Sequence, residues 1–249
     1  MEHAIPFMVD GAAAGAAPAA AFVTVPETTL PGSIVVPAFE VGQFATSRSA
    51  AGALTINGSD QPWTRINFAS AQAAAAAAGY KLITELQWLA IAWDASQVAS
   101  NWSGGAVGVG KLNQGIRDDD CARHGDYLPD AVEADPVRRH LTLSNGQRVY
   151  DFNGNVFQWV FDDVQGDAQG LIAKTITADS PSRAVALAAG AADWRANCLG
   201  RQPDYDPKWS GYALIRGGYF YSGDYAGVFD LDYVWPDYAG DDVGFRCTK

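Results

Sequence analysis

The sequence predicts one α+β domain over residues 33–249, preceded by an arm over residues 1–32 that is rich in Ala, Gly and Pro. Two helix patterns follow each other between residues 67 and 93, and β-type apolar runs lie on either side of them. Of the 249 residues, 48% are apolar, which is enough to bury a substantial core. No repeat or linker interrupts the chain after residue 33.

The N-terminal end carries no signal for export or membrane insertion. Its first residues, MEHAIPFMVD, include an acid where a signal peptide has basic residues, and no apolar run reaches membrane-spanning length. We therefore expect no membrane insertion, and a location in the cytoplasm or in a virus particle. The composition of the arm predicts a weakly structured segment without a core of its own.

The two helices are the clearest local elements, and short strands are expected before them in Ser33–Ser47. Asn67 or Ser70 can cap the first helix, whose alanines have the highest helix propensity of all residues. Thr84 caps the second helix, and Gln87 three residues later completes a capping box. The apolar residues of the second helix recur at helical spacing, so this helix is expected to face the core.

β structure is expected to return after residue 140. The run Ser144-Asn145-Gly146 is a hairpin signal between LTL and RVYDF. The apolar run VFQWVF at 156–161 is typical of a buried strand. The connection at 162–212 is long, with one short helix expected around 183–189.

Charge and composition argue against several kinds of site. The net charge is −11 and no basic stripe is present, so nucleic acid is not expected as a ligand. The Gly-rich residues 101–110 lack a phosphate-loop motif, and the acidic run 118–120 lacks the spacing of a calcium loop. The three cysteines are far apart and odd in number, which predicts free thiols instead of a zinc site or a disulfide framework; they are Cys121, Cys198 and Cys247.

The C-terminal segment, residues 216–247, has an unusual composition. Between Gly217 and Phe245 it contains five tyrosines and six aspartates, but no Lys, Arg, Glu, Gln, Asn, His, Thr, Met or Cys. Tyrosine supplies large contact area at low entropic cost, and aspartate supplies hydrogen-bond acceptors. This alphabet is more typical of a binding surface than of a catalytic site.

Three motifs, taken in order, resemble those of the formylglycine-generating-enzyme (sulfatase-modifying factor) type of C-type lectin fold. They are GYKLITELQWLAIA at 79–92, YDFNGNVFQWVFD at 150–162, and RGGYFY with the closing VGFRC in 216–247. The resemblance covers about residues 33–249. It implies a loop-rich fold with small antiparallel sheets and two helices, in which residues 39–44 pair with residues 244–248.

Several functions occur on that fold, so the function must be argued from the site. The sulfatase-activating oxidase uses a pair of nearby cysteines in its C-terminal third, whereas the only cysteine after residue 198 here is Cys247. An iron-dependent sulfoxide synthase needs a histidine cluster, which His3, His124 and His140 do not form by their spacing. An oxidase of this type or an inactive homologue remains the alternative function. We expect no catalytic residue, cofactor or metal, and Gln158 offers no carboxylate to a calcium ion.

The sequence resembles most closely the variable proteins of diversity-generating retroelements. In that family a reverse transcriptase rewrites the 3′ end of the target gene with errors at adenines, mainly in AAC codons. The resulting codons end in C and encode Tyr, Asp, Ser, Gly, Ala, Val or Phe, which matches residues 219–242. Trp235 cannot arise from such a codon, so it is either a fixed residue or evidence against part of this interpretation.

The resemblance implies a diversified ligand-binding surface on a fixed framework. Its partner is expected to be an unknown macromolecule, a protein with a basic or donor-rich surface that suits the aspartates. Gly217, Gly218, Gly227, Val228, Phe229, Leu231, Val243, Gly244 and Phe245 are expected to be framework residues. The expected contact residues, with Trp235 included, are Tyr219, Tyr221, Ser222, Asp224, Tyr225, Asp230, Asp232, Tyr233, Val234, Trp235, Asp237, Tyr238, Ala239, Gly240, Asp241 and Asp242.

Overall fold

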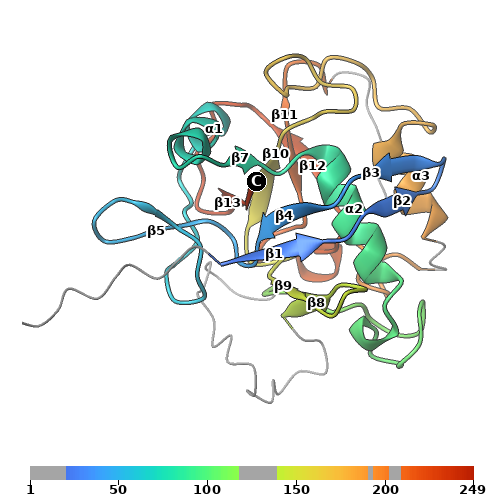
Figure 1. Cartoon of the computed structure of the whole chain (residues 1–249). Helices are drawn as coiled ribbons and strands as arrows, with labels where there is room; N and C mark the ends of the chain where they lie inside the picture. Colours follow the sequence, from blue (N-terminus) through green and yellow to red (C-terminus); the bar gives the residue numbers. More distant parts are fainter. Residues whose placement is uncertain (1–20, 118–138, 190–192, 202–208) are drawn as a thin grey trace, which may run out of the picture.

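The computed structural model describes residues 21–117, 139–189, 193–201 and 209–249 (Figure 1). The expected acidic loop at 118–120 and the first twenty residues of the arm lie outside these ranges. In the described part of the chain, no helix is long and apolar enough to cross a membrane. The helices are α1 (Phe68–Ala77), α2 (Glu85–Ser96) and α3 (Pro181–Ala188), with short 3-10 turns η1 (Ala99–Asn101) and η3 (Gly223–Tyr225).

The described residues contain fourteen strands of only two to four residues each, so loops make up much of the fold. They are β1 (Phe22–Val25), β2 (Thr28–Leu30), β3 (Ile34–Val36), β4 (Phe39–Gly42), β5 (Ser47–Arg48), β6 (Leu54–Thr55), β7 (Lys81–Leu82), β8 (His140–Thr142), β9 (Arg148–Tyr150), β10 (Phe157–Val160), β11 (Ala213–Arg216), β12 (Leu231–Val234), β13 (Val243–Phe245) and β14 (Cys247–Thr248).

One four-stranded sheet joins the two ends of the described chain, in the order β1-β4-β14-β7. Thr248 pairs with Val41, so the expected pairing of residues 39–44 with 244–248 is confirmed. β1 pairs along its whole length with β4, and Val25 is fully buried in the core. Residues 22–32, which the sequence assigned to the arm, therefore take part in the fold.

The second four-stranded sheet has the order β12-β11-β10-β13 and carries most of the C-terminal segment. β11 is antiparallel to both β10 and β12, whereas β13 runs parallel to β10, which the expectation of antiparallel sheets did not include. β12 and β13 therefore lie at opposite edges and run in the same direction. Because of this, residues 235–242 must run back across the sheet from the end of β12 to the start of β13.

The helix signals of the sequence are confirmed at the atomic level. The Asn67 side chain accepts a hydrogen bond from the Ser70 backbone N–H at 2.9 Å and caps α1. Thr84 and Gln87 form both hydrogen bonds of the capping box at the start of α2. The expected hairpin is the β8–β9 pair. The expected short helix is α3, which starts at Pro181, where proline's fixed φ suits the first helical position.

The core consists of two apolar clusters, one around α2 and one between α1 and the second sheet. Trp88, Trp159 and Phe245 are fully buried in them. Arg246 is also fully buried, where it donates hydrogen bonds to the Gln158 side chain and to the Gly42 carbonyl oxygen. Arg246 and Gln158 are therefore internal structural groups.

Candidate functional site

The C-terminal segment is built on a framework of buried residues. All nine expected framework residues are buried, from Gly217 to Phe245. A Cβ at Gly217 would lie 2.9 Å from the Phe152 carbonyl oxygen, and one at Gly227 would lie 2.0 Å from the Gly200 nitrogen. Gly217 also has φ of +95°, which disfavours any side chain there. Close backbone approach therefore requires glycine at both positions.

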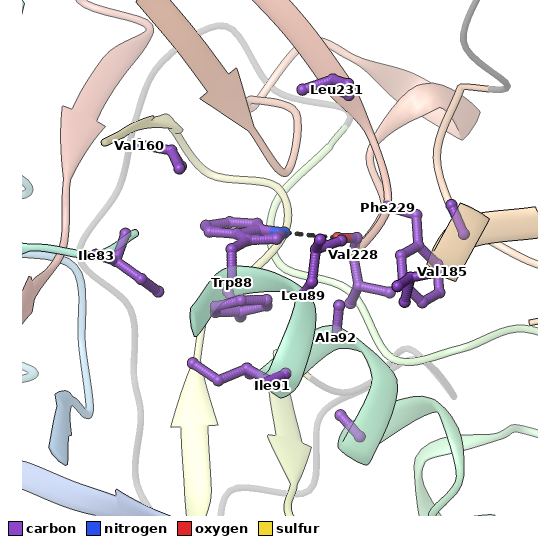
Figure 2. Close-up of a cluster of buried hydrophobic side chains, with 14 of the residues drawn as sticks. Ile83, Trp88, Leu89, Ile91, Ala92, Val160, Val185, Val228, Phe229 and Leu231 are labelled. Carbon is purple, nitrogen blue, oxygen red and sulfur yellow. Dashed lines mark hydrogen bonds between the residues drawn. The ribbon is translucent and has the colours of Figure 1, made fainter. Parts of the chain in front are cut away.

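Trp88 of α2 supports the middle of the segment. Its indole N–H donates to the Val228 carbonyl oxygen at 2.7 Å, and its ring stacks on Phe152 at 3.9 Å between centroids. Figure 2 shows this hydrogen bond beside the buried side chains of Phe229 and Leu231. The loop that precedes β12 is thus fixed to the helix by both packing and a hydrogen bond.

A fully buried ion pair fixes the start of the segment. Both Arg216 and Glu85 have no exposed side-chain surface, and the Arg216 guanidinium forms two hydrogen bonds with the Glu85 carboxylate, one of them Nε to Oε2 at 3.0 Å. Arg216 Nη1 also donates to the Phe229 carbonyl oxygen at 3.2 Å. The guanidinium therefore connects β11 to α2 through Glu85 and to the residues just before β12 through Phe229.

Most of the expected contact residues reach the surface. Tyr221 is 71% exposed, Trp235 62% and Tyr225 42%. The exposed members are Tyr221, Asp224, Tyr225, Trp235, Asp237, Tyr238, Ala239 and Asp241. The half-buried members are Tyr219, Ser222, Asp232, Tyr233, Val234, Gly240 and Asp242.

Asp230 is the exception, because its side chain is buried. Its Oδ1 accepts a hydrogen bond from the Arg201 backbone N–H at 3.1 Å, and the Arg201 Nε lies 3.7 Å away. Its Oδ2 has no partner among the described residues. Burial raises the pKa of Asp230 to about 7, although the nearby Arg201 charge opposes the shift. In this conformation Asp230 is a buried structural residue that a ligand cannot contact. The set of contact residues expected from the sequence included it, and that expectation is wrong for Asp230.

Four aromatic rings follow one another along the β12 end of the surface. Tyr233 packs against Trp209 at 4.0 Å and against Tyr212 at 4.9 Å, and Tyr212 contacts Trp235 at 5.7 Å. Tyr233 also packs against the core cluster, whereas Trp235 extends into solvent. Tyr233 therefore combines a structural role with partial exposure.

Residues 63–68 hold the crossing loop at 236–242. The Arg65 backbone N–H donates to the Gly240 carbonyl oxygen at 2.8 Å, and the Phe68 N–H donates to the Pro236 oxygen at 3.0 Å. Within the loop, the Tyr238 hydroxyl donates to Asp242 at 2.8 Å. Partial burial and this carboxylate raise the pKa of Tyr238 to about 12.

A hollow of about 480 Å³ opens beside the turn η3. It is lined by Arg117, Arg195, Tyr221, Ser222, Gly223, Asp224 and Tyr225. The Arg195 guanidinium carbon lies 4.3 Å from the centre of the Tyr225 ring, in cation–π contact. The Gly223 N–H donates to the Arg117 carbonyl oxygen at 2.9 Å, so the rim is held by a backbone hydrogen bond.

Sequence reasoning missed the residues that other parts of the chain bring to this surface. Arg117 and Arg195 line the hollow, and Trp209 and Tyr212 extend the aromatic row. All four belong to irregular connections, and no motif or periodicity distinguishes them. Only the long-range packing of the fold places them next to the C-terminal segment.

The enzymes considered for this fold use metal ligands or reactive thiols. In the described ranges no group of three or more His, Cys, Asp or Glu side chains is placed to hold a metal ion. Cys198 and Cys247 are buried. Burial raises the pKa of the Cys247 thiol to about 11, so this thiol stays protonated and is a poor nucleophile at neutral pH.

Comparisons with known proteins agree with this architecture. Residues 40–249 match the sulfatase-modifying factor enzyme 1-like domain model. Treponema denticola variable protein 1 has the same fold, with a TM-score of 0.50 and 13% identity over 91% of this chain and 93% of that one. Both findings identify the fold as C-type lectin-like.

Two further solved structures are more distant. PvdO from Pseudomonas aeruginosa gives a TM-score of 0.38 at 15% identity, covering 92% of this chain and 90% of that chain. The Major Tropism Determinant M1 variant gives 0.44 at 12% identity, covering 89% of this chain and 51% of that chain. Curated protein sequences contain no significant match.

Proposed function

We propose that this chain, which belongs to the sulfatase-modifying factor enzyme 1-like domain family, is a ligand-binding protein whose C-terminal segment is a diversified recognition surface. The segment is the target of retroelement mutagenesis in this proposal. Its macromolecular ligand binds without covalent chemistry, through the exposed tyrosines, Trp235 and aspartates.

One observation carries the proposal: in residues 217–245 the restricted alphabet and the burial pattern coincide. The nine framework residues are buried, whereas fifteen of the sixteen expected contact residues are exposed or half-buried. A polar loop without a binding role is not expected to expose several tyrosine side chains to solvent. Here Tyr221 and Tyr225 extend into solvent although tyrosine gains free energy by burial.

Preorganisation supports the binding function further. Trp88, Arg216 and the backbone contacts of residues 63–68 hold the segment in place before any ligand arrives. A surface that is already ordered loses little conformational entropy on binding, so more of the contact energy appears as affinity. Tyrosines with two side-chain torsions add to this advantage.

The oxidase alternative has weaker support. The related chemistry needs two neighbouring reactive thiols, whereas the one cysteine of the C-terminal segment, Cys247, lies in the core with a raised pKa. No observation of the described residues favours an oxygen- or copper-dependent site over a binding surface. An assay for peptide-cysteine oxidation with added copper tests this alternative directly.

Sequencing of the gene tests the proposal. Tyr and Asp codons in 219–242 are expected to end in C, an imperfect copy of the segment is expected nearby, and a reverse-transcriptase gene is expected beside it. Population sequencing should find substitutions at the contact codons and unchanged codons for Gly217 and Phe229. If the Tyr and Asp codons do not end in C and no copy of the segment lies nearby, retroelement mutagenesis drops out of the proposal. Substitutions spread evenly over framework and contact codons would contradict the assignment of the recognition surface.

A further inference from the structure

The hollow beside η3 combines fixed and variable residues. Five of its lining residues belong to the C-terminal segment, at 221–225, whereas Arg117 and Arg195 come from earlier parts of the chain. If the segment is diversified as proposed above, mutagenesis confined to it leaves both arginines unchanged. Every variant of the protein then keeps two cationic side chains at this point of its recognition surface.

Among the described residues that line the hollow, cationic side chains outnumber acidic ones. The chain has a net charge of −11, but the lining of the hollow contains two arginines and one aspartate. Asp224 is exposed, and it forms no ion pair with Arg195. A cationic side chain on a protein with a negative net charge attracts an anionic group of a ligand. The carboxylates elsewhere on the surface repel acidic partners, so an anionic group is favoured at the cation and disfavoured at other positions.

The geometry of Arg195 favours a planar anion. Its guanidinium carbon lies over the Tyr225 ring, 4.3 Å from the ring centre, and a cation–π contact of this kind leaves the N–H donors available to an anion. A carboxylate matches this fork with two parallel hydrogen bonds. The ring of Tyr225 restricts the arginine in advance, so less side-chain entropy is lost when the anion binds.

We propose that this hollow is a carboxylate-binding subsite that takes an aspartate or glutamate side chain of the protein ligand. The inference rests on the proposed function, because it assigns a role to the same surface. Arg195 supplies the constant donor group and Arg117 belongs to the same lining, whereas in this variant Tyr221 and Tyr225 form the aromatic wall. The constant anchor selects ligands that present an acidic side chain, while the neighbouring variable residues distinguish among those ligands.

The test is an NMR titration of the ¹⁵N-labelled full chain with two probes, acetyl-Gly-Glu-Gly-amide and acetyl-Gly-Gln-Gly-amide. The glutamate probe should shift the Arg195 Nε–H signal and the amides of 221–225 and bind roughly tenfold more tightly than the glutamine probe. The preference should decrease with added salt, because the contact is partly exposed.

Arg195→Gln should remove the preference, and Arg48→Gln is its matched control. Arg48 is also exposed and also lies over an aromatic ring, with its guanidinium carbon 4.9 Å from the centre of Trp63, but it is not among the residues that line the hollow. Equal responses to both probes, or an unchanged glutamate response in Arg195→Gln, would overturn the subsite. Failure of the subsite leaves the proposed function intact, because that function is tested separately by the codon sequence of 219–242 and by the tyrosine variants. The two failures are therefore distinguishable.

Discussion

Trp88 on α2 donates its indole N–H to the carbonyl oxygen of Val228, 140 residues further along the chain, at 2.7 Å. Through this bond α2 holds the loop before β12, which carries part of the proposed recognition surface. Because the hydrogen bond is to a backbone oxygen, it does not depend on which side chains the segment carries. A framework of this kind lets the outer residues change without moving the backbone.

Removing that support should destabilise the whole domain. We expect Trp88→Ala to lower the free energy of unfolding by roughly 3–5 kcal/mol, because it leaves a cavity in the core. Trp88→Phe keeps most of the volume but leaves the Val228 oxygen without its donor, at a cost of about 1–3 kcal/mol. Urea denaturation measures both. Trp235→Ala is the control, and a cost as large as that of Trp88→Ala would place Trp235 in the framework.

Two tyrosines of the segment should behave differently. Tyr221→Ala should leave stability within about 0.5 kcal/mol of the natural protein, since Tyr221 is 71% exposed. Tyr233→Ala should lower the melting temperature by several degrees, because its ring packs on Trp209 and the core. Thermal unfolding compares the two. An equal loss of stability in both variants would show that Tyr221 is a core residue and that the surface interpretation fails.

The buried ion pair should be intolerant of losing one partner. Glu85→Gln leaves the Arg216 guanidinium buried without its counter-charge, which typically costs about 3–5 kcal/mol. Glu40→Gln is the matched control, because Glu40 pairs with Lys249 at 3.1 Å on the surface and such pairs contribute about 0–1 kcal/mol. Chemical denaturation of the two variants at one pH separates the cases. Similar losses of unfolding free energy in the two variants would contradict a stabilising role for the buried Arg216–Glu85 pair.

Asp230 should make stability depend on pH. Its folded pKa of about 7 lies above the usual 3.8, so between these values the folded state binds more protons than the unfolded state. Stability from this group is therefore fully present below about pH 4 and is lost as the pH rises through 7. Asp230→Asn should remove this dependence and make the protein more stable than the natural chain at pH 8, by on the order of 1–4 kcal/mol. Chemical denaturation of both proteins at pH 5 and pH 8 measures this difference. If Asp230→Asn keeps the pH dependence of the natural chain, the dependence does not come from Asp230.

Local signals carried the successful part of the sequence prediction. The capping box of Thr84 and Gln87 and the cap at Asn67 depend on residues three apart, so the structure reproduces them. The pairing of the last strand with residues 39–44 and the burial of Phe245 were expected from the family resemblance. These features are determined either by short-range hydrogen bonds or by a framework common to the fold.

The remaining features depend on long-range packing. β1 has the alternating sequence FVTV, but the Ala- and Pro-rich residues before it made the whole region resemble an arm. The burial of Asp230 could not be predicted, because the alphabet of the segment does not say which side of the backbone faces the core. Arg195 reaches the hollow only through the path of the connection between α3 and β11.

A stability-selected library of the C-terminal segment tests the central claim most directly. Each codon from 217 to 245 is randomised singly in the full chain, and protease-resistant variants are sequenced. We predict that the exposed contact positions, such as Tyr221, Asp224, Trp235 and Asp237, accept most residues, whereas Gly217, Gly227, Phe229 and Phe245 accept almost none. If the contact positions prove as intolerant as the framework, the segment is an ordinary part of the core and the account of an exchangeable recognition surface is wrong.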